Sequence, residues 1–146
     1  MDLTTSYPAS VRETMHGIVQ LKRTIDKGKA FAAGTNGEYN YDCPMDKAVF
    51  GFLGLNHAAL LDVIKKANSQ DEIVAYVKPF VDKKSAAEIN AFNEEFVKHA
   101  PAPGSDAEKY FLATRNQIGA NRTDITTWAD LLDLEEKRTV PERVHA

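Results

Sequence analysis

A complete start signal for one amphipathic helix lies in Ser85-Ala86-Ala87-Glu88-Ile89, and the apolar face continues at Phe92 and Phe96. In this capping box the serine hydroxyl accepts a hydrogen bond from the amide three residues on. The glutamate carboxylate accepts one from the amide at the cap. The same Ser-x-x-Glu pattern begins at three other residues, Ser10, Ser69 and Ser105. Four such signals in 146 residues predict an all-α protein.

The spacing of apolar residues between turn signals places the helices. We expect a bundle of about six to seven helices in which a short helix over 10–16 is cut off by Gly17, because glycine weakens a helix interior. The longer helices are expected over 18–33, 44–53, from Asn56, from Ser69 to Pro79, and over 85–99, 105–118 and 126–137. In the last two, the core residues expected are Phe111, Ile118, Trp128, Leu131 and Leu132.

The length of the chain fits one domain. Residues 101–104, Pro-Ala-Pro-Gly, resemble a linker, yet only about 40 residues follow them, too few to fold alone without help. We therefore expect a single domain over 1–146, with residues 139–146 as a tail.

Composition narrows the class of protein. No apolar run approaches the roughly 20 residues of a membrane helix, and the first residues lack the basic and apolar regions of a signal peptide. A single cysteine also argues against a secreted disulfide scaffold. The net charge of −3 does not suit binding to phosphate backbones. These observations predict a cytoplasmic protein with no membrane or nucleic-acid partner.

The chemistry-bearing stretch follows the early long helix. Asn36-Gly37 predicts a tight turn, and residues 38–43 then alternate in a way typical of a short extended segment. If extended, this segment places Tyr39, Tyr41 and Cys43 on one side. Pro44 suits the first position of the next helix, which leaves Cys43 at its cap.

A mixed, net basic helix flank precedes this stretch, and Arg23 and Lys27 belong to it. Such a flank usually decorates a solvated surface. We expect it instead to lie beside residues 38–46 and to form a site for a small polar or anionic ligand or a protein partner. The candidate ligand-binding residues are Arg23, Asp26, Lys27, Tyr39, Tyr41, Cys43 and Asp46.

Two alternatives remain open for the same residues. Cys43 at a helix start could be a thiolate nucleophile of an enzyme, with Asp26 or Asp46 handling protons. The other is a structural protein without a ligand, in which Cys43 packs as a small hydrophobe. The four histidines are scattered, and no metal-binding, nucleotide-binding or hydrolase motif occurs. We therefore predict no metal and no cofactor.

Four motifs together resemble the bacterial family known as domain of unknown function 5069. They are Leu21-Lys22-Arg23-Thr24-Ile25-Asp26-Lys27, Ala33-Gly34-Thr35-Asn36-Gly37-Glu38-Tyr39, Cys43-Pro44-Met45-Asp46 and Thr123-Asp124-Ile125-Thr126-Thr127-Trp128. The family often has proline where this chain has Lys22, which implies that the long helix begins near that position. The resemblance implies no activity, but it covers the same helix flank and Tyr-Cys stretch.

Overall fold

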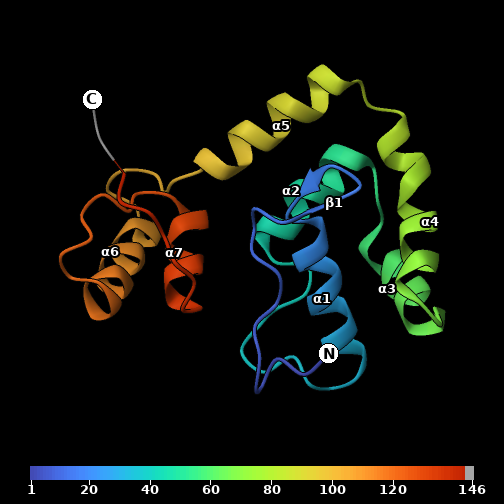
Figure 1. The fold of residues 1–146 in the computed structure, drawn as a ribbon, viewed down its shortest axis with the longest axis horizontal. Coiled ribbons are helices and arrows are strands. Elements are labelled where there is room, and N and C mark those ends of the chain that lie inside the picture. Colours follow the sequence, from blue (N-terminus) through green and yellow to red (C-terminus); the bar gives the residue numbers. More distant parts are fainter. Residues whose placement is uncertain (144–146) are drawn as a thin grey trace. The chain divides into compact units, whose positions relative to one another are not determined.

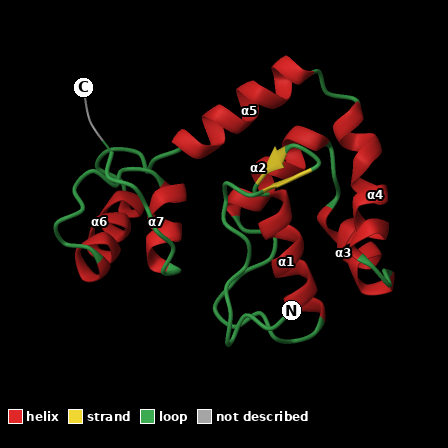
Figure 2. Ribbon diagram, viewed as in Figure 1, coloured by secondary structure: helices red, strands yellow, loops and turns green. Residues whose placement is uncertain are grey.

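The computed structural model describes residues 1–143, and this part of the chain contains seven α-helices and one small β-hairpin (Figure 1; Figure 2). The elements are β1 Thr14–Met15, β2 Ile18–Val19, α1 Leu21–Ala32, α2 Pro44–Leu53, α3 His57–Lys66, α4 Gln70–Asp82, α5 Ala86–Lys98, α6 Asp106–Ile118 and α7 Trp128–Glu135. The helical fold class predicted from the sequence is confirmed.

Three of the four predicted capping boxes begin helices. Before α5, the Glu88 amide donates to Ser85 Oγ at 3.1 Å and the Ser85 amide donates to the Glu88 carboxylate at 3.0 Å. Ser69 and Ser105 likewise accept hydrogen bonds at the starts of α4 and α6. These bonds satisfy amides that have no partner inside the helix.

The fourth box, at Ser10, is a wrong prediction, because residues 10–16 form no helix. Here the Ser10 hydroxyl accepts from the Arg12 amide, and the chain continues into the antiparallel hairpin β1–β2. Its two loop residues, His16 and Gly17, both have positive φ, 50° and 83°. This left-handed pair matches the twist of a tight hairpin and excludes a helix. The following helix, α1, therefore begins at Leu21 rather than at residue 18.

Two further local predictions differ from the structure. Helix α4 does not end at Pro79 but continues to Asp82, with Val77 and Val81 buried on either side of the exposed proline. Residues 38–43 form turns and coil rather than a strand, and Asp42 is left-handed with φ 66°. The turn at Asn36-Gly37 is confirmed by a hydrogen bond from the Tyr39 amide to the Asn36 carbonyl.

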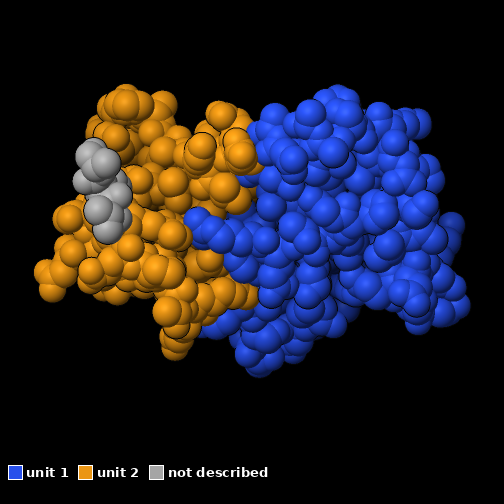
Figure 3. Space-filling model, turned by 45° about the horizontal axis from the view of Figure 1, so that its top comes forward, with its two compact units in different colours: residues 1–93 blue, residues 94–146 orange. Residues whose placement is uncertain are grey.

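The described chain forms two compact units, residues 1–93 and the part from residue 94 onward (Figure 3). In the first, α1 packs against α2 and α3. Its fully buried side chains include Leu21, Ile25, Val49, Leu60 and Val77. The single-domain organisation over 1–146 stays a prediction.

Close packing inside the first unit depends on Gly28 of α1. A Cβ atom at this position would lie 2.8 Å from Ile64 Cδ1 and 3.1 Å from Tyr41 Cε1. Glycine therefore lets α3 and the Tyr41 ring approach the backbone of α1, which brings the loop after α1 close to this helix.

The second unit has its own apolar cluster, made of Phe111, Ile125, Leu131 and Val140, with Trp128 and Leu134 packed against it. Ile118, expected in the core, is 41% exposed. Residues 139–143, expected as part of a tail, form no helix or strand, yet Val140 is buried. Residues 144–146 of that expected tail lie outside the described residues.

Among the described residues, no single helix is long and apolar enough to cross a membrane. Helices α2 and α3 reach the required length and composition only together, and the chain bends by 94° between them.

Candidate functional site

The first unit contains a buried ion pair between α1 and α2. Lys27 Nζ lies 2.7 Å from Asp46 Oδ2, and the two side chains are 5% and 0% exposed. The same ammonium group donates to the Asn40 carbonyl at 3.0 Å and to Cys43 Sγ at 3.2 Å. All three ammonium protons thus have acceptors in the protein, one of which is the thiol sulfur.

Asp46 is the centre of this cluster. Its Oδ1 accepts hydrogen bonds from Gln20 Nε2, at 3.0 Å, and from the Thr24 hydroxyl. Its Oδ2 accepts from the Cys43 amide at 3.2 Å, in addition to the ion pair with Lys27. Burial by itself would raise the pKa of Asp46, but the Lys27 charge and the hydrogen bonds outweigh it and hold that pKa below its usual value. The carboxylate is therefore charged at neutral pH.

Local sequence explains how these groups meet. Thr24 and Lys27 are three residues apart in α1, so they project from one face of this helix, and Gln20 directly precedes its first turn. Asp46 is the third residue of α2 and forms a capping box with Cys43. The capping interaction thus fixes Asp46 beside the thiol and points both toward α1.

Gln20 is a strained member of the cluster. Its backbone is left-handed, with φ 69°, and the residue is only 1% exposed. Its side-chain oxygen has no hydrogen-bond partner among the described residues. Backbone strain of this kind persists only where surrounding contacts enforce it. Sequence analysis missed Gln20 and Thr24, although their spacing from Lys27 was a usable signal.

Arg23 and Asp26 contact a different segment, the backbone of Ala9. Arg23 Nη1 donates to the Ala9 carbonyl at 3.1 Å, and the Ala9 amide donates to Asp26 Oδ2 at 2.9 Å. The Arg23 guanidinium also lies 5.6 Å from the centre of the Tyr39 ring. Both charged residues are buried, so they hold the N-terminal segment and Tyr39 against α1.

Tyr41 is directed toward α3. Its hydroxyl donates to the His57 carbonyl at 2.7 Å, and its ring packs near Phe31 and Phe50. Burial, reinforced by Asp46 and other nearby groups, raises the pKa of Tyr41, so this phenol is neutral at physiological pH. The helix flank and the Tyr-Cys stretch do lie side by side, as predicted, but the seven candidate residues divide among three sets of contacts.

Cys43 is the member of the ion-pair cluster with a chemically reactive atom. Its side chain is half-buried, it is the sole cysteine of the chain, and it stands at the start of α2. The Lys27 ammonium group and the N-terminus of α2 both lie beside this sulfur. Within the described part of the chain, no group of three or more histidine, cysteine or acidic side chains is arranged to hold a metal ion.

Fold and site together define a mostly helical protein in which a buried lysine–aspartate pair supports a single thiol. The chain belongs to the family described as domain of unknown function (DUF5069), whose model matches residues 5–138. The family resemblance found in the sequence motifs is thereby confirmed. A comparison with curated proteins finds no match.

Proposed function

We propose that this protein acts through Cys43 as a nucleophilic thiol that reacts with a small electrophilic substrate or ligand. The observation that supports it is the 3.2 Å contact between Lys27 Nζ and Cys43 Sγ, because this lysine cannot turn away from its buried aspartate. A fixed ammonium group stabilises negative charge on sulfur, and the thiolate is the nucleophilic form of cysteine.

The roles of the surrounding residues follow from their contacts. The thiol proton leaves to solvent, the sulfur electron pair forms the bond to the electrophilic atom, and the leaving group departs with the electrons of the broken bond. In this proposal Lys27 stabilises the thiolate by donating to the sulfur, and Asp46 holds Lys27 in position. Asp46 is a poor proton acceptor itself, because it is fully buried and already accepts four hydrogen bonds.

Anchoring of an anionic ligand by Arg23 and Lys27 has less support. Both side chains are buried, at 3% and 4% exposure, and both donate to protein acceptors. An anion would have to displace those contacts and bear the cost of desolvation. A small polar ligand could instead contact the half-buried Tyr39 and Cys43.

The test is the rate at which iodoacetamide alkylates Cys43 at pH 7 in the native chain and in the chain unfolded by urea. An ordinary cysteine thiol, with a pKa of about 8.5, is roughly 3% ionised at pH 7, so a site that favours the thiolate accelerates alkylation. We expect the native chain to react at least as fast as the unfolded chain.

A matched control is the double variant Lys27→Met with Asp46→Asn, which removes both charges while keeping similar side-chain volumes. It should label more slowly than the wild type if it remains folded. Native labelling slower than unfolded labelling, with no change in the double variant, would favour the structural alternative in which Cys43 only packs.

We also propose that the protein is bacterial and cytoplasmic. The family resemblance supports the origin, and a lone reactive thiol suits a reducing compartment.

A further inference from the structure

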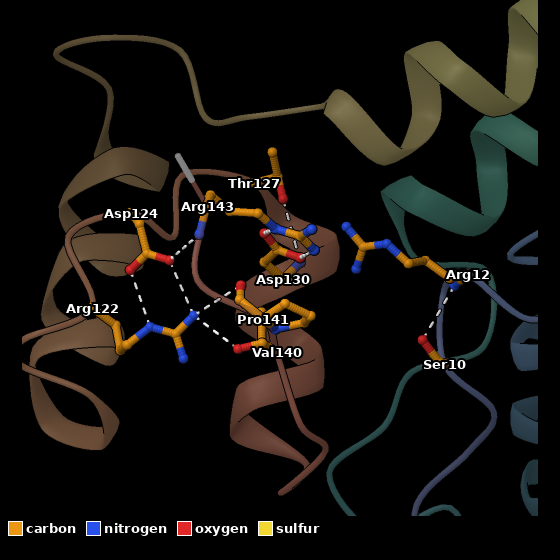
Figure 4. A network of polar contacts seen from close by, with 9 residues as sticks. All are labelled: Ser10, Arg12, Arg122, Asp124, Thr127, Asp130, Val140, Pro141 and Arg143. Carbon is orange, nitrogen blue, oxygen red and sulfur yellow. Dashed lines mark hydrogen bonds and ion pairs between the residues drawn. The ribbon is translucent and has the colours of Figure 1, made fainter. Parts of the chain in front are cut away.

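A segment without regular secondary structure, residues 139–143, crosses the second unit after α7 (Figure 4). We call this segment the C-terminal strap. Val140 inserts into the apolar cluster and is 7% exposed. The strap thus covers the core of the second unit with one side chain, and its polar contacts surround that side chain.

Most of those contacts are made to the strap backbone. Arg122 donates to the carbonyls of Val140 and Pro141, at 2.9 and 3.2 Å, and forms a two-pronged pair with Asp124 at 3.0 Å (Figure 4). Asp124 in turn accepts from the Arg143 amide at 2.9 Å. Contacts to backbone carbonyls and to an amide recognise the backbone of an extended segment and depend little on its side chains.

The end of the strap is fixed by a second two-pronged pair. The Arg143 guanidinium donates to both oxygens of Asp130 in α7, at 3.0 and 2.8 Å, and the Asp130 side chain is 4% exposed. Bidentate pairs of this kind combine strength with geometric selectivity. The strap is therefore held by a buried apolar residue and a matched arginine three positions later.

The hinge between α7 and the strap is strained. The amides of Lys137 and Arg138 donate back to the carbonyls of Leu134 and Asp133, which is the Schellman ending of a helix. Lys137 takes the left-handed position of this motif, with φ 62°, where glycine is usual. The Cβ atom of Lys137 disfavours this left-handed backbone, in which the strap folds back onto its own unit. An extended backbone at Lys137 would relieve the strain.

We propose that the C-terminal strap exchanges between two copies of this chain, so that each strap binds the second unit of the other copy. The contacts that dock the strap come from residues 140–143, beyond the hinge, and the same contacts can form with a second copy. The hinge itself is held by its two backbone hydrogen bonds and by ion pairs of Arg138 with Asp133 and Glu136. The closed monomer and the exchanged dimer then differ chiefly in the hinge, and short strained hinges favour exchange.

The test is sedimentation equilibrium of the full chain from micromolar to millimolar concentration, for the wild type, Lys137→Gly and Lys137→Pro. We expect a concentration-dependent dimer in the wild type. Lys137→Gly should weaken it by at least about fivefold, because glycine accepts positive φ without strain. Lys137→Pro should strengthen it, because proline cannot adopt φ near 62°.

Arg143→Ala distinguishes exchange from ordinary surface association. Because monomer and dimer share the Arg143–Asp130 pair, this variant should leave the dimerisation constant nearly unchanged while loosening the strap in both states. Fluorescence of Trp128, the sole tryptophan, reports that loosening from the same cluster.

The proposal is overturned if the wild type stays monomeric up to millimolar concentration. It is also overturned if Lys137→Gly dimerises as strongly as the wild type. These two refuting results come from the wild type and from Lys137→Gly. The proposal can therefore be tested even if Lys137→Pro does not fold.

Discussion

Replacement of Lys27 by methionine tests how strongly the buried ion pair holds the first unit together. Methionine nearly matches lysine in length but leaves the Asp46 carboxylate buried without its counter-charge. Since the Asp46 side chain is 0% exposed, water cannot solvate the remaining charge. Removal of one member of a buried pair costs about 3–5 kcal/mol in the free energy of unfolding. We expect Lys27→Met to fall in this range.

The companion variant, Lys27→Met with Asp46→Asn, removes both charges. It should recover most of the lost stability, because a buried pair replaced by neutral groups of similar volume is often close to neutral in free energy. The amide oxygen of asparagine can still accept from Gln20 or Thr24. A double-mutant cycle completed with Asp46→Asn alone gives the coupling energy between the two positions.

The assay is urea unfolding followed by far-ultraviolet circular dichroism, which reports helices of both units. With a slope of roughly 2 kcal/mol/M, the single variant should lower the unfolding midpoint of the first unit by about 1.5–2.5 M. Trp128 fluorescence reports the second unit and serves as the internal control. A loss below about 1 kcal/mol, or a double variant as unstable as the sum of the singles, would refute a tightly coupled buried pair.

Three further predictions concern acidity, the α7 hinge and the core. Because the pKa of Asp46 is lowered in the folded chain, the stability that this carboxylate contributes is present above its unfolded pKa of about 3.9 and is lost as the pH falls through the folded pKa. The difference in unfolding free energy between wild type and Asp46→Asn, measured in urea, should therefore shrink below about pH 4. A constant difference would contradict the lowered pKa of Asp46. Lys137→Gly should raise the stability of the second unit by about 1 kcal/mol, measured by thermal unfolding monitored at Trp128, whereas a decrease would argue against strain at this position. Phe111→Ala should cost about 3–5 kcal/mol in denaturant unfolding, while Ile118→Ser should cost less than about 0.5 kcal/mol, and equal losses would place Ile118 in the core after all.

Local signals in the sequence predicted the helical part of this fold well. Helix α2 begins at Pro44 and ends at Leu53 before the left-handed Gly54, as its proline and glycine indicate. Start signals of the Ser-x-x-Glu type failed only at Ser10, where the left-handed His16-Gly17 pair imposes a hairpin. A capping pattern involves only four residues. It therefore cannot predict a helix where the residues that follow it form a tight turn that reverses the chain.

The candidate site was predicted in part. Sequence reasoning selected Lys27, Cys43 and Asp46 and expected them to be adjacent, and the structure brings them into contact. It also assigned Lys27 to bind a ligand, whereas the folded chain uses all three of its protons internally. Charged residues on a helix flank look alike in sequence whether they face water or a buried partner.

The sequence alone determined the helical class and most of the helix boundaries, because these depend on interactions between residues a few positions apart. It also determined the family, because the motifs of the family stand in the sequence itself. Tertiary structure decided which charges are buried, as with Asp46, and which apparent tail residues are packed, as with Val140. Lys27 and Asp46 lie 19 positions apart in the chain, and Val140 packs in a cluster with Phe111, 29 positions before it. Burial and pairing of this kind require contacts between segments that are distant in the sequence, and no local sequence pattern specifies such contacts.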